Sequence, residues 1–303
     1  MSSRALPIVV GIGLVVTAVA QAVTIAGHEP EPPVLLRLQP EEGQTVSYRM
    51  EMEMDGRVSA GLLGQPFEVT LVLEQDWRVE EVEADGSVTI EIETTLVEAT
   101  TPQGPIPESE LAGVEEPSTM RFAADGRVLD ASFGVTGGIT GPASIPGLEG
   151  FGPTFPEDPV APGDTWDLSA ELPLLPGGPS LTITGEGVLD DYEEVHGVRS
   201  AVIVSEANMP LDFELDLEEL AEELGPEGGL PEGEIGGTIA YEGEMTIGSR
   251  QWVDPATGLQ VRSEGGGAAE ISFSLPALPQ NGDTPAVPST RMEFDVEITL
   301  ERR

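Results

Sequence analysis

Apolar and polar residues alternate along much of the chain with a period of two. This spacing gives a β-strand one buried and one exposed face. The clearest run is YRMEMEM, at residues 48–54. Longer alternating runs cover residues 67–82 and 87–99, and the Ala84-Asp85-Gly86 segment between them is typical of a tight hairpin. We therefore predict two long antiparallel strands joined by this turn.

The same combination of alternating runs and turn residues recurs further along the chain. Pairs of strands are predicted at 120–123 and 128–131 around Asp125-Gly126, at 181–189 and 198–207 around a loop containing His196-Gly197, and at 250–253 and 259–263 around Asp254–Gly258, with a last strand at 291–300. No helical crossovers alternate with these strands, so a parallel sheet is not expected. The predicted fold is mainly β, an antiparallel sheet built of hairpins with one or two short helices.

One short helix is predicted within the β-rich chain. Leu217, Leu220, Ala221 and Leu224 recur at helical spacing, and Gly225-Pro226 ends the run. The favoured interpretation is a helix that caps a sheet edge or a barrel end. The alternative is a lid over a pocket.

The N-terminal residues predict export. Arg4 precedes an apolar run, and Ala18-Val19-Ala20 provides the small residues of a signal-peptide cleavage site. Because the apolar character persists to Ala26, an uncleaved anchor formed by residues 5–26 is the alternative. We expect residues 1–26 to be a signal peptide or anchor helix and place the rest in the periplasm or at the cell surface.

The remaining chain is expected to comprise a spacer and one β domain. Residues 27–40 are rich in Pro and Glu and are interpreted as the spacer. Residues 41–303 are assigned to the antiparallel domain. Pro- and Gly-rich stretches interrupt this domain, and one of them, near 134–154, is where it would divide if it had two lobes.

The net charge of the chain limits the kinds of partner that it can bind. The chain has 55 Asp and Glu against 13 basic residues, all Arg, and a formal net charge of -42. Such a surface repels nucleic acid and anionic lipid headgroups. The carboxylates also repel one another unless salt screens their charges. We therefore favour adaptation to high salt, rather than codon bias, as the origin of the acidic composition without Lys.

The sequence contains few residues of the types that usually serve in catalysis or metal binding. There is no Cys, and His28 and His196 are the two histidines. Common nucleophile, Schiff-base and zinc arrangements therefore lack their components, and no phosphate or dinucleotide motif is present. We predict that the protein is not an enzyme and uses no cofactor or metal site. A carboxylate-dependent hydrolase is the remaining catalytic alternative.

The most distinctive string is FPEDPVAPGDTW, which contains Phe155, Pro156, Pro159, Gly163 and Trp166. The prolines favour an extended approach, the glycine permits a turn, and the tryptophan is suited to anchoring the next strand. We interpret the motif as structural rather than catalytic. The alternative is that Trp166 is exposed and binds a ligand.

This string resembles the fP-x-x-P-V-x-x-G-(D/E)-x-W signature of uncharacterised exported bacterial proteins and lipoproteins in domain-of-unknown-function families. The D-x-x-T-G-l turn of those families is matched at Asp254, Thr257, Gly258 and Leu259. The resemblance extends in pattern over roughly residues 40–300, but this chain lacks the lipidation Cys. It implies an envelope protein with a large curved antiparallel sheet or open half-barrel, similar to lipoprotein carriers, and no catalytic residue.

Two functions follow as hypotheses. The first is a non-catalytic envelope protein that binds a lipid or other hydrophobic small molecule within a curved sheet. The second is an acidic cell-surface structural or interaction protein that contacts envelope proteins or cations. An internal apolar cavity favours the first, whereas an exposed apolar patch favours the second.

Overall fold

The described chain forms one antiparallel sheet of thirteen strands. The computed structural model describes residues 31–60, 63–106, 117–132, 154–173, 180–216, 237–274 and 289–303. The strands are β1 (Thr45–Ala60), β2 (Leu63–Val82), β3 (Val88–Thr101), β4 (Gly104–Pro105), β5 (Ser118–Phe122), β6 (Val128–Ser132), β7 (Thr165–Pro173), β8 (Ser180–Val195), β9 (Val198–Pro210), β10 (Phe213–Asp216), β11 (Thr238–Val253), β12 (Gln260–Ser274) and β13 (Thr290–Arg302).

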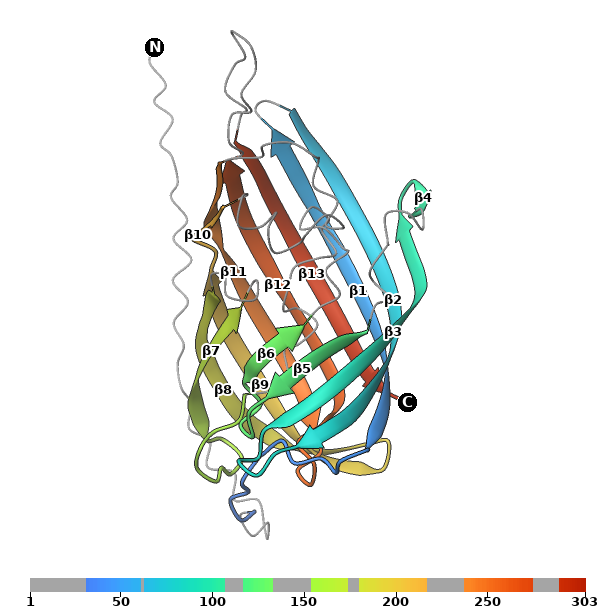
Figure 1. The fold of residues 1–303 in the computed structure, drawn as a ribbon, viewed down its shortest axis with the longest axis vertical. Coiled ribbons are helices and arrows are strands. Elements are labelled where there is room, and N and C mark those ends of the chain that lie inside the picture. Colours follow the sequence, from blue (N-terminus) through green and yellow to red (C-terminus); the bar gives the residue numbers. More distant parts are fainter. Residues whose placement is uncertain are drawn as a thin grey trace, which may run out of the picture. The chain divides into compact units, whose positions relative to one another are not determined.

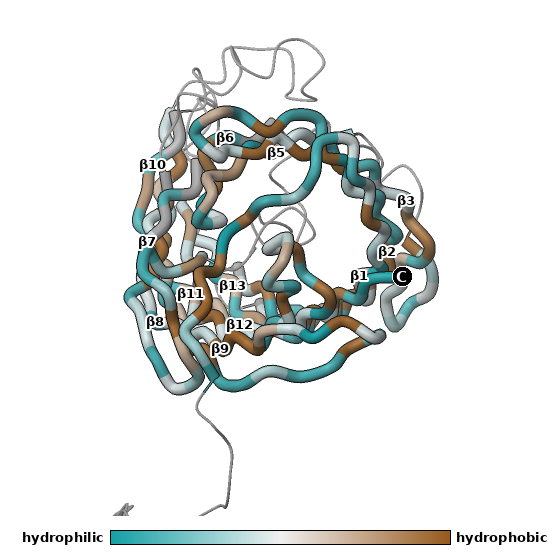
Figure 2. Tube along the Cα trace, turned by 90° about the horizontal axis from the view of Figure 1, so that it is seen from below, coloured by the Kyte–Doolittle hydropathy of each residue, from teal (hydrophilic) through white to brown (hydrophobic). Residues whose placement is uncertain are grey.

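The sheet is curved and open (Figure 1). Its order is β6-β5-β3-β2-β1-β13-β12-β11-β9-β8-β7, with β4 beside β3 and β10 beside β11. Seen along its axis, the strands follow one another around a curved wall (Figure 2). Within the described residues no ladder joins the two edge strands, β6 and β7. A sheet of this many strands curls because each strand carries the same right-handed twist. The predicted antiparallel half-barrel is confirmed.

The first and last strands lie side by side in the middle of the sheet. β1 pairs with β13 over its whole length beyond Tyr48, and with β2 on its other side. Met50, Met52 and Met54 are buried on one face of β1, whereas Glu51 and Glu53 are exposed on the other. The period-two pattern therefore sets which face is buried.

The hairpins occur where the sequence predicts them, but several strands are longer than the sequence pattern predicts. The loop at His196-Gly197 contains only these two residues, because Asp190–Val195 continues β8 after a bulge between Leu189 and Asp191. β11 begins at Thr238 rather than at Arg250, and β12 continues to Ser274 rather than ending at Ser263. The sequence pattern missed these extensions because glycine and charged residues obscure the alternation there.

The two faces of the sheet differ in chemistry. Side chains on the inner, concave face form the main hydrophobic cluster, to which β1, β2, β3, β8, β9, β11, β12 and β13 contribute. The outer, convex face is polar and carries most of the carboxylates. A small second cluster of Val202, Trp252 and Val261 is buried on this outer face. The apolar interior is therefore enclosed by the curl of the sheet itself.

One end of the curl is closed by a floor of turns and one extended segment. Residues 34–38, within the segment interpreted as a spacer, cross this end, and Leu36 is fully buried there. The main chain of Val34 pairs with Val160, and the amide of Leu38 donates to Ala124 at 2.8 Å. The Arg37 guanidinium donates to the carbonyls of Pro156 at 2.5 Å and Glu157 at 2.6 Å. This one arginine therefore ties the N-terminal segment to the 155–164 loop.

Several predictions fall outside the described residues. These are the signal peptide or anchor at 1–26, the lobe division near 134–154 and the helix at 217–224. Within the described ranges the elements are strands, and no helix there is long and apolar enough to cross a membrane.

Candidate functional site

The residues of the FPEDPVAPGDTW motif lie in the floor and at the start of β7. Phe155 is buried, and its amide donates to the carbonyl of Asp125 at 2.7 Å. Gly163 has a φ of +93° and donates to Leu189 at 2.7 Å, while Pro159 is exposed. The Trp166 indole is half-buried and donates to the carbonyl of Thr154 at 2.9 Å. These contacts connect the loop to the rest of the floor and form no cluster of reactive groups.

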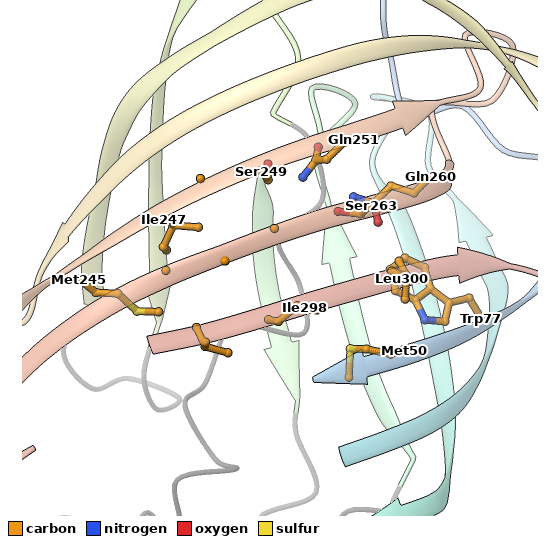
Figure 3. Close-up of a pocket in the computed structure, with 15 residues that line it drawn as sticks. Met50, Trp77, Met245, Ile247, Ser249, Gln251, Gln260, Ser263, Ile298 and Leu300 are labelled. Carbon is orange, nitrogen blue, oxygen red and sulfur yellow. The ribbon is translucent and has the colours of Figure 1, made fainter. Parts of the chain in front are cut away.

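A hollow lies on the concave face, above this floor (Figure 3). Its cavity volume is about 60 Å³, within a wider space of about 600 Å³ that includes open solvent. It is lined by Met50, Trp77, Met245, Ile247, Gly248, Ser249, Gln251, Gln260, Ser263, Gly265, Gly266, Gly267, Val296, Ile298 and Leu300. These residues come from β1, β2, β11, β12 and β13, at the centre of the sheet.

A band of small residues on β11 and β12 creates the hollow. Gly265 pairs with Ser249 on one side and with Ile298 on the other. Gly267 similarly lies between Ile247 and Val296. Because glycine has no side chain, these positions remove volume from the inner face while the larger residues around them form the walls. The sequence signal for this band is the run Gly265-Gly266-Gly267, which the analysis of alternation did not single out.

Uncharged polar groups gather where the hollow meets the floor. Gln251 and Gln260 are both buried, and Ser263 lies beside them (Figure 3). The Tyr48 hydroxyl donates to the carbonyl of Gln260 at 2.9 Å. Burial raises the pKa of Tyr48 well above its usual value, against a smaller opposing effect of Arg302, so the phenol stays protonated. This end of the hollow therefore combines uncharged amide and hydroxyl groups with the apolar side chains of Met50, Trp77 and Leu300.

A second, smaller hollow continues into the floor. It is lined by Leu38, Trp77, Ile90, Phe122, Gly126, Phe155, Gly258, Leu259 and Gln260. Trp77 and Gln260 line both hollows. The indole of Trp77 donates to Gln75 at 3.2 Å, which fixes the ring between the two spaces. Phe155 of the sequence motif thus lines this second hollow.

Trp252 is buried in the small cluster on the convex face, opposite the hollow. Its indole donates to Glu193 at 2.8 Å, and Arg250 and Arg262 lie over the ring at 5.4 and 5.0 Å from its centroid. The hydrogen bond from Trp252, followed by that from Arg250, lowers the pKa of Glu193. This cluster covers a small apolar patch with paired charges on an otherwise acidic surface.

The described residues were also considered as ligands for a metal ion. A depression on the convex face is lined by five carboxylates together with Arg57, Phe294, Thr246 and three small residues; the carboxylates are Asp55, Glu244, Glu270, Glu293 and Asp295. In the described ranges no group of three His, Cys, Asp or Glu side chains is placed to hold a metal ion. His196, in the β8–β9 turn, is exposed, and its Nε2 atom lies 3.0 Å from a carboxylate oxygen of Glu301.

Comparisons with known proteins define no family for this chain. No family model matches the sequence, and no curated protein matches it. Among solved structures, a lipovitellin chain described for its lipid–protein interactions aligns with a TM-score of 0.40 and 11% identity over 86% of this chain. This chain spans a quarter of that protein, 25% of its length.

Two bacterial structures align over most of their length but with lower scores. DynF from the dynemicin biosynthesis pathway of Micromonospora chersina has a TM-score of 0.19 and 9% identity, covering 90% of this chain and 92% of that one. A DUF1329 family protein from Desulfovibrio piger has a TM-score of 0.14 and 10% identity, covering 86% and 85%. Since fold similarity at this level does not carry function, the function is inferred from the hollow itself.

Proposed function

We propose that this chain is an exported, non-catalytic protein of the cell envelope that binds a hydrophobic small molecule in its concave hollow. The observation that carries the proposal is the band of small residues, Ser249, Gly265 and Gly267, enclosed by apolar walls. A Cβ atom at Gly267 would lie 2.5 Å from the carbonyl oxygen of Thr246, and one at Gly265 would lie 3.1 Å from that of Gly248, so the close approach of the neighbouring backbone favours glycine here. The missing side chains leave the inner face hollow between the apolar walls, and this is the space that we propose a ligand fills.

The chemistry of the walls favours an apolar ligand. Met50 and Met245 face the hollow, and flexible thioether side chains adapt to ligands of different shape. Ile247, Val296 and Ile298 supply further apolar surface. Burial of apolar ligand surface against these residues contributes about 25 cal/mol per Å². An apolar pocket with a few converging polar groups is the usual form of a small-molecule site.

The other parts of the proposal rest on the sequence. Export rests on the apolar run at 5–26 and the small residues at Ala18 and Ala20. The absence of catalysis is proposed because the described residues that line the hollow are apolar, amide or hydroxyl side chains and glycine, with no base or activated nucleophile among them.

We expect Ile298→Trp to abolish binding of an apolar fluorescent probe such as N-phenylnaphthylamine. The larger ring occupies the space that the glycine band leaves, so the affinity falls by at least about tenfold, equivalent to about 1.4 kcal/mol. The matched control is Thr299→Trp, which places the same ring on the convex face one residue away. Binding is measured by fluorescence titration, with circular dichroism to verify the fold.

The pair of variants separates a specific site from general hydrophobicity. If Thr299→Trp weakens probe binding as much as Ile298→Trp, the probe does not occupy the hollow. If neither variant changes the affinity, binding in the concave hollow is contradicted.

A further inference from the structure

The indole ring of Trp77 lies between the two hollows of the concave face. Trp77 and Gln260 are the two residues that line both of them. The first hollow has a cavity volume of about 60 Å³, and the second, toward the floor, has one of about 30 Å³. Figure 3 shows Trp77 beside Leu300 and Met50 at one end of the first hollow. Trp77 is therefore part of the wall that separates the two spaces.

Contacts along β2 and with its neighbours restrain this ring. Trp77 lies in register with Val46 on β1 and with Ile92 on β3, and only 8% of its surface is exposed. Its indole nitrogen donates to the buried side chain of Gln75 at 3.2 Å. A buried indole N–H requires an acceptor, so this hydrogen bond opposes rotation of the ring.

Tyr48 supports the ring from the neighbouring strand β1. The two ring centroids are 4.9 Å apart and the ring planes are inclined by 60°, which is an edge-to-face contact. The hydroxyl of Tyr48 in turn donates to the carbonyl oxygen of Gln260 at 2.9 Å. Tyr48 thus links Trp77 to Gln260, the other residue of the wall, and the wall is held as one unit.

The position of Trp77 differs from that of a ring that only fills a core. Such a ring is in contact with other side chains on all sides, because each gap forfeits dispersion contacts. Trp77 instead borders a hollow on two sides. The second hollow offers further apolar surface from Leu38, Phe122 and Leu259. A ligand in the first hollow would reach this surface if the ring were smaller.

We infer that Trp77 limits the size of the ligand by closing the inner end of the binding hollow. A cavity of about 150 Å³ holds benzene. The enclosed part of this hollow, about 60 Å³, therefore takes only the end of a hydrocarbon ligand. The ligand class is a molecule that ends in a short alkyl group, with its remainder in the wider, open space. This inference rests on the proposed function and specifies the residue that determines which ligands fit.

A series of straight-chain alcohols from butanol to dodecanol tests this role of Trp77. Each methylene that enters the hollow raises the affinity about fourfold, equivalent to about 0.8 kcal/mol. In the unaltered protein we expect this rise to end at a short chain length. In Trp77→Leu we expect it to continue for about two further methylenes, because the second hollow becomes accessible. Displacement of the bound apolar probe measures the affinities.

Trp252→Leu is the matched control, since it removes a similarly buried tryptophan from the convex face. We expect it to leave the chain length at which the rise ends unchanged. A loss of stability alone weakens the binding of every alcohol without moving that chain length. If the rise ends at the same chain length in Trp77→Leu and in the unaltered protein, the inference is overturned and the proposed function stands. If the unaltered protein binds neither the alcohols nor the probe, the proposed function itself is contradicted.

A second measurement needs no substitution and applies even if Trp77→Leu fails to fold. Octanol brominated at the chain end is compared with octanol brominated next to the carbon that carries the hydroxyl, because bromine quenches tryptophan fluorescence at short range. Trp77 lines the hollow, whereas Trp166 and Trp252 do not belong to its described lining. We expect stronger quenching by the alcohol with the terminal bromine. Equal quenching by the two alcohols at saturation would show that the alkyl end does not meet Trp77 and would overturn the inference.

Discussion

Replacing Gly258 with alanine is expected to destabilise the protein by about 3 kcal/mol or more, one of the largest effects of a single methyl group in this fold. Gly258 has a φ of +73°, and a Cβ atom there would lie 2.1 Å from the carbonyl oxygen of Arg37. The left-handed conformation alone costs a non-glycine residue about 1–2 kcal/mol. The remainder arises because the segment around Arg37 must move away from the floor.

Gly43→Ala is the matched control for this substitution. Gly43 has a φ of +78°, but a Cβ atom there would meet no atom within 4 Å. We expect this variant to lose only the cost of the left-handed conformation, about 1–2 kcal/mol. The free energies of unfolding are compared by urea denaturation at one fixed salt concentration. Equal losses for the two variants would show that the contact between Gly258 and Arg37 does not hold the floor in place.

The second large effect expected is a rise in stability with salt. Like charges face each other directly across neighbouring strands on the convex face, at Glu53–Glu297, Asp55–Asp295, Glu244–Glu270 and Glu186–Glu206. Each such pair costs about 0.2–1 kcal/mol, so relief of these four repulsions adds about 1–4 kcal/mol to the free energy of unfolding. Molar salt shortens the Debye length to about 3 Å, less than the spacing of facing side chains. Thermal melts across a sodium chloride series measure the effect.

A charge-removal variant distinguishes this repulsion from a general effect of salt. Glu53→Gln, Asp55→Asn, Asp295→Asn and Glu297→Gln together remove two facing pairs at exposed positions. We expect this variant to melt at a higher temperature than the unaltered chain in dilute buffer and to respond less to added salt. A melting temperature of the unaltered chain that is the same in dilute buffer and molar salt would contradict adaptation to high salt.

Much of the fold was predictable from local pattern. The alternation at residues 48–54 determines which face of β1 is buried, and turns such as Asp85-Gly86 and Asp125-Gly126 determine where hairpins form. The pairing of β1 with β13 was not predictable in this way, because these strands lie about as far apart in sequence as the chain allows. Their pairing joins the run of strands from β1 to β6 to the run from β7 to β13, and no local turn specifies it.

The candidate site was less accessible to sequence analysis than the fold. The motif that drew attention, with Phe155 and Trp166, lies mainly in the floor. The residues that make the hollow are Gly265 and Gly267, whose role depends on the register that sets them beside Ile247 and Ile298. A glycine in a strand indicates a bulge or a close approach as readily as an empty space. The distinction requires the neighbouring strands.

Native mass spectrometry of the protein purified from its own source tests the central claim, that the concave hollow holds a hydrophobic small molecule, most directly. We expect a mass that exceeds that of the chain alone by one small hydrophobic molecule, which organic solvent extracts. A mass equal to that of the chain alone at high recovery, together with no uptake of the apolar probe, would contradict the claim.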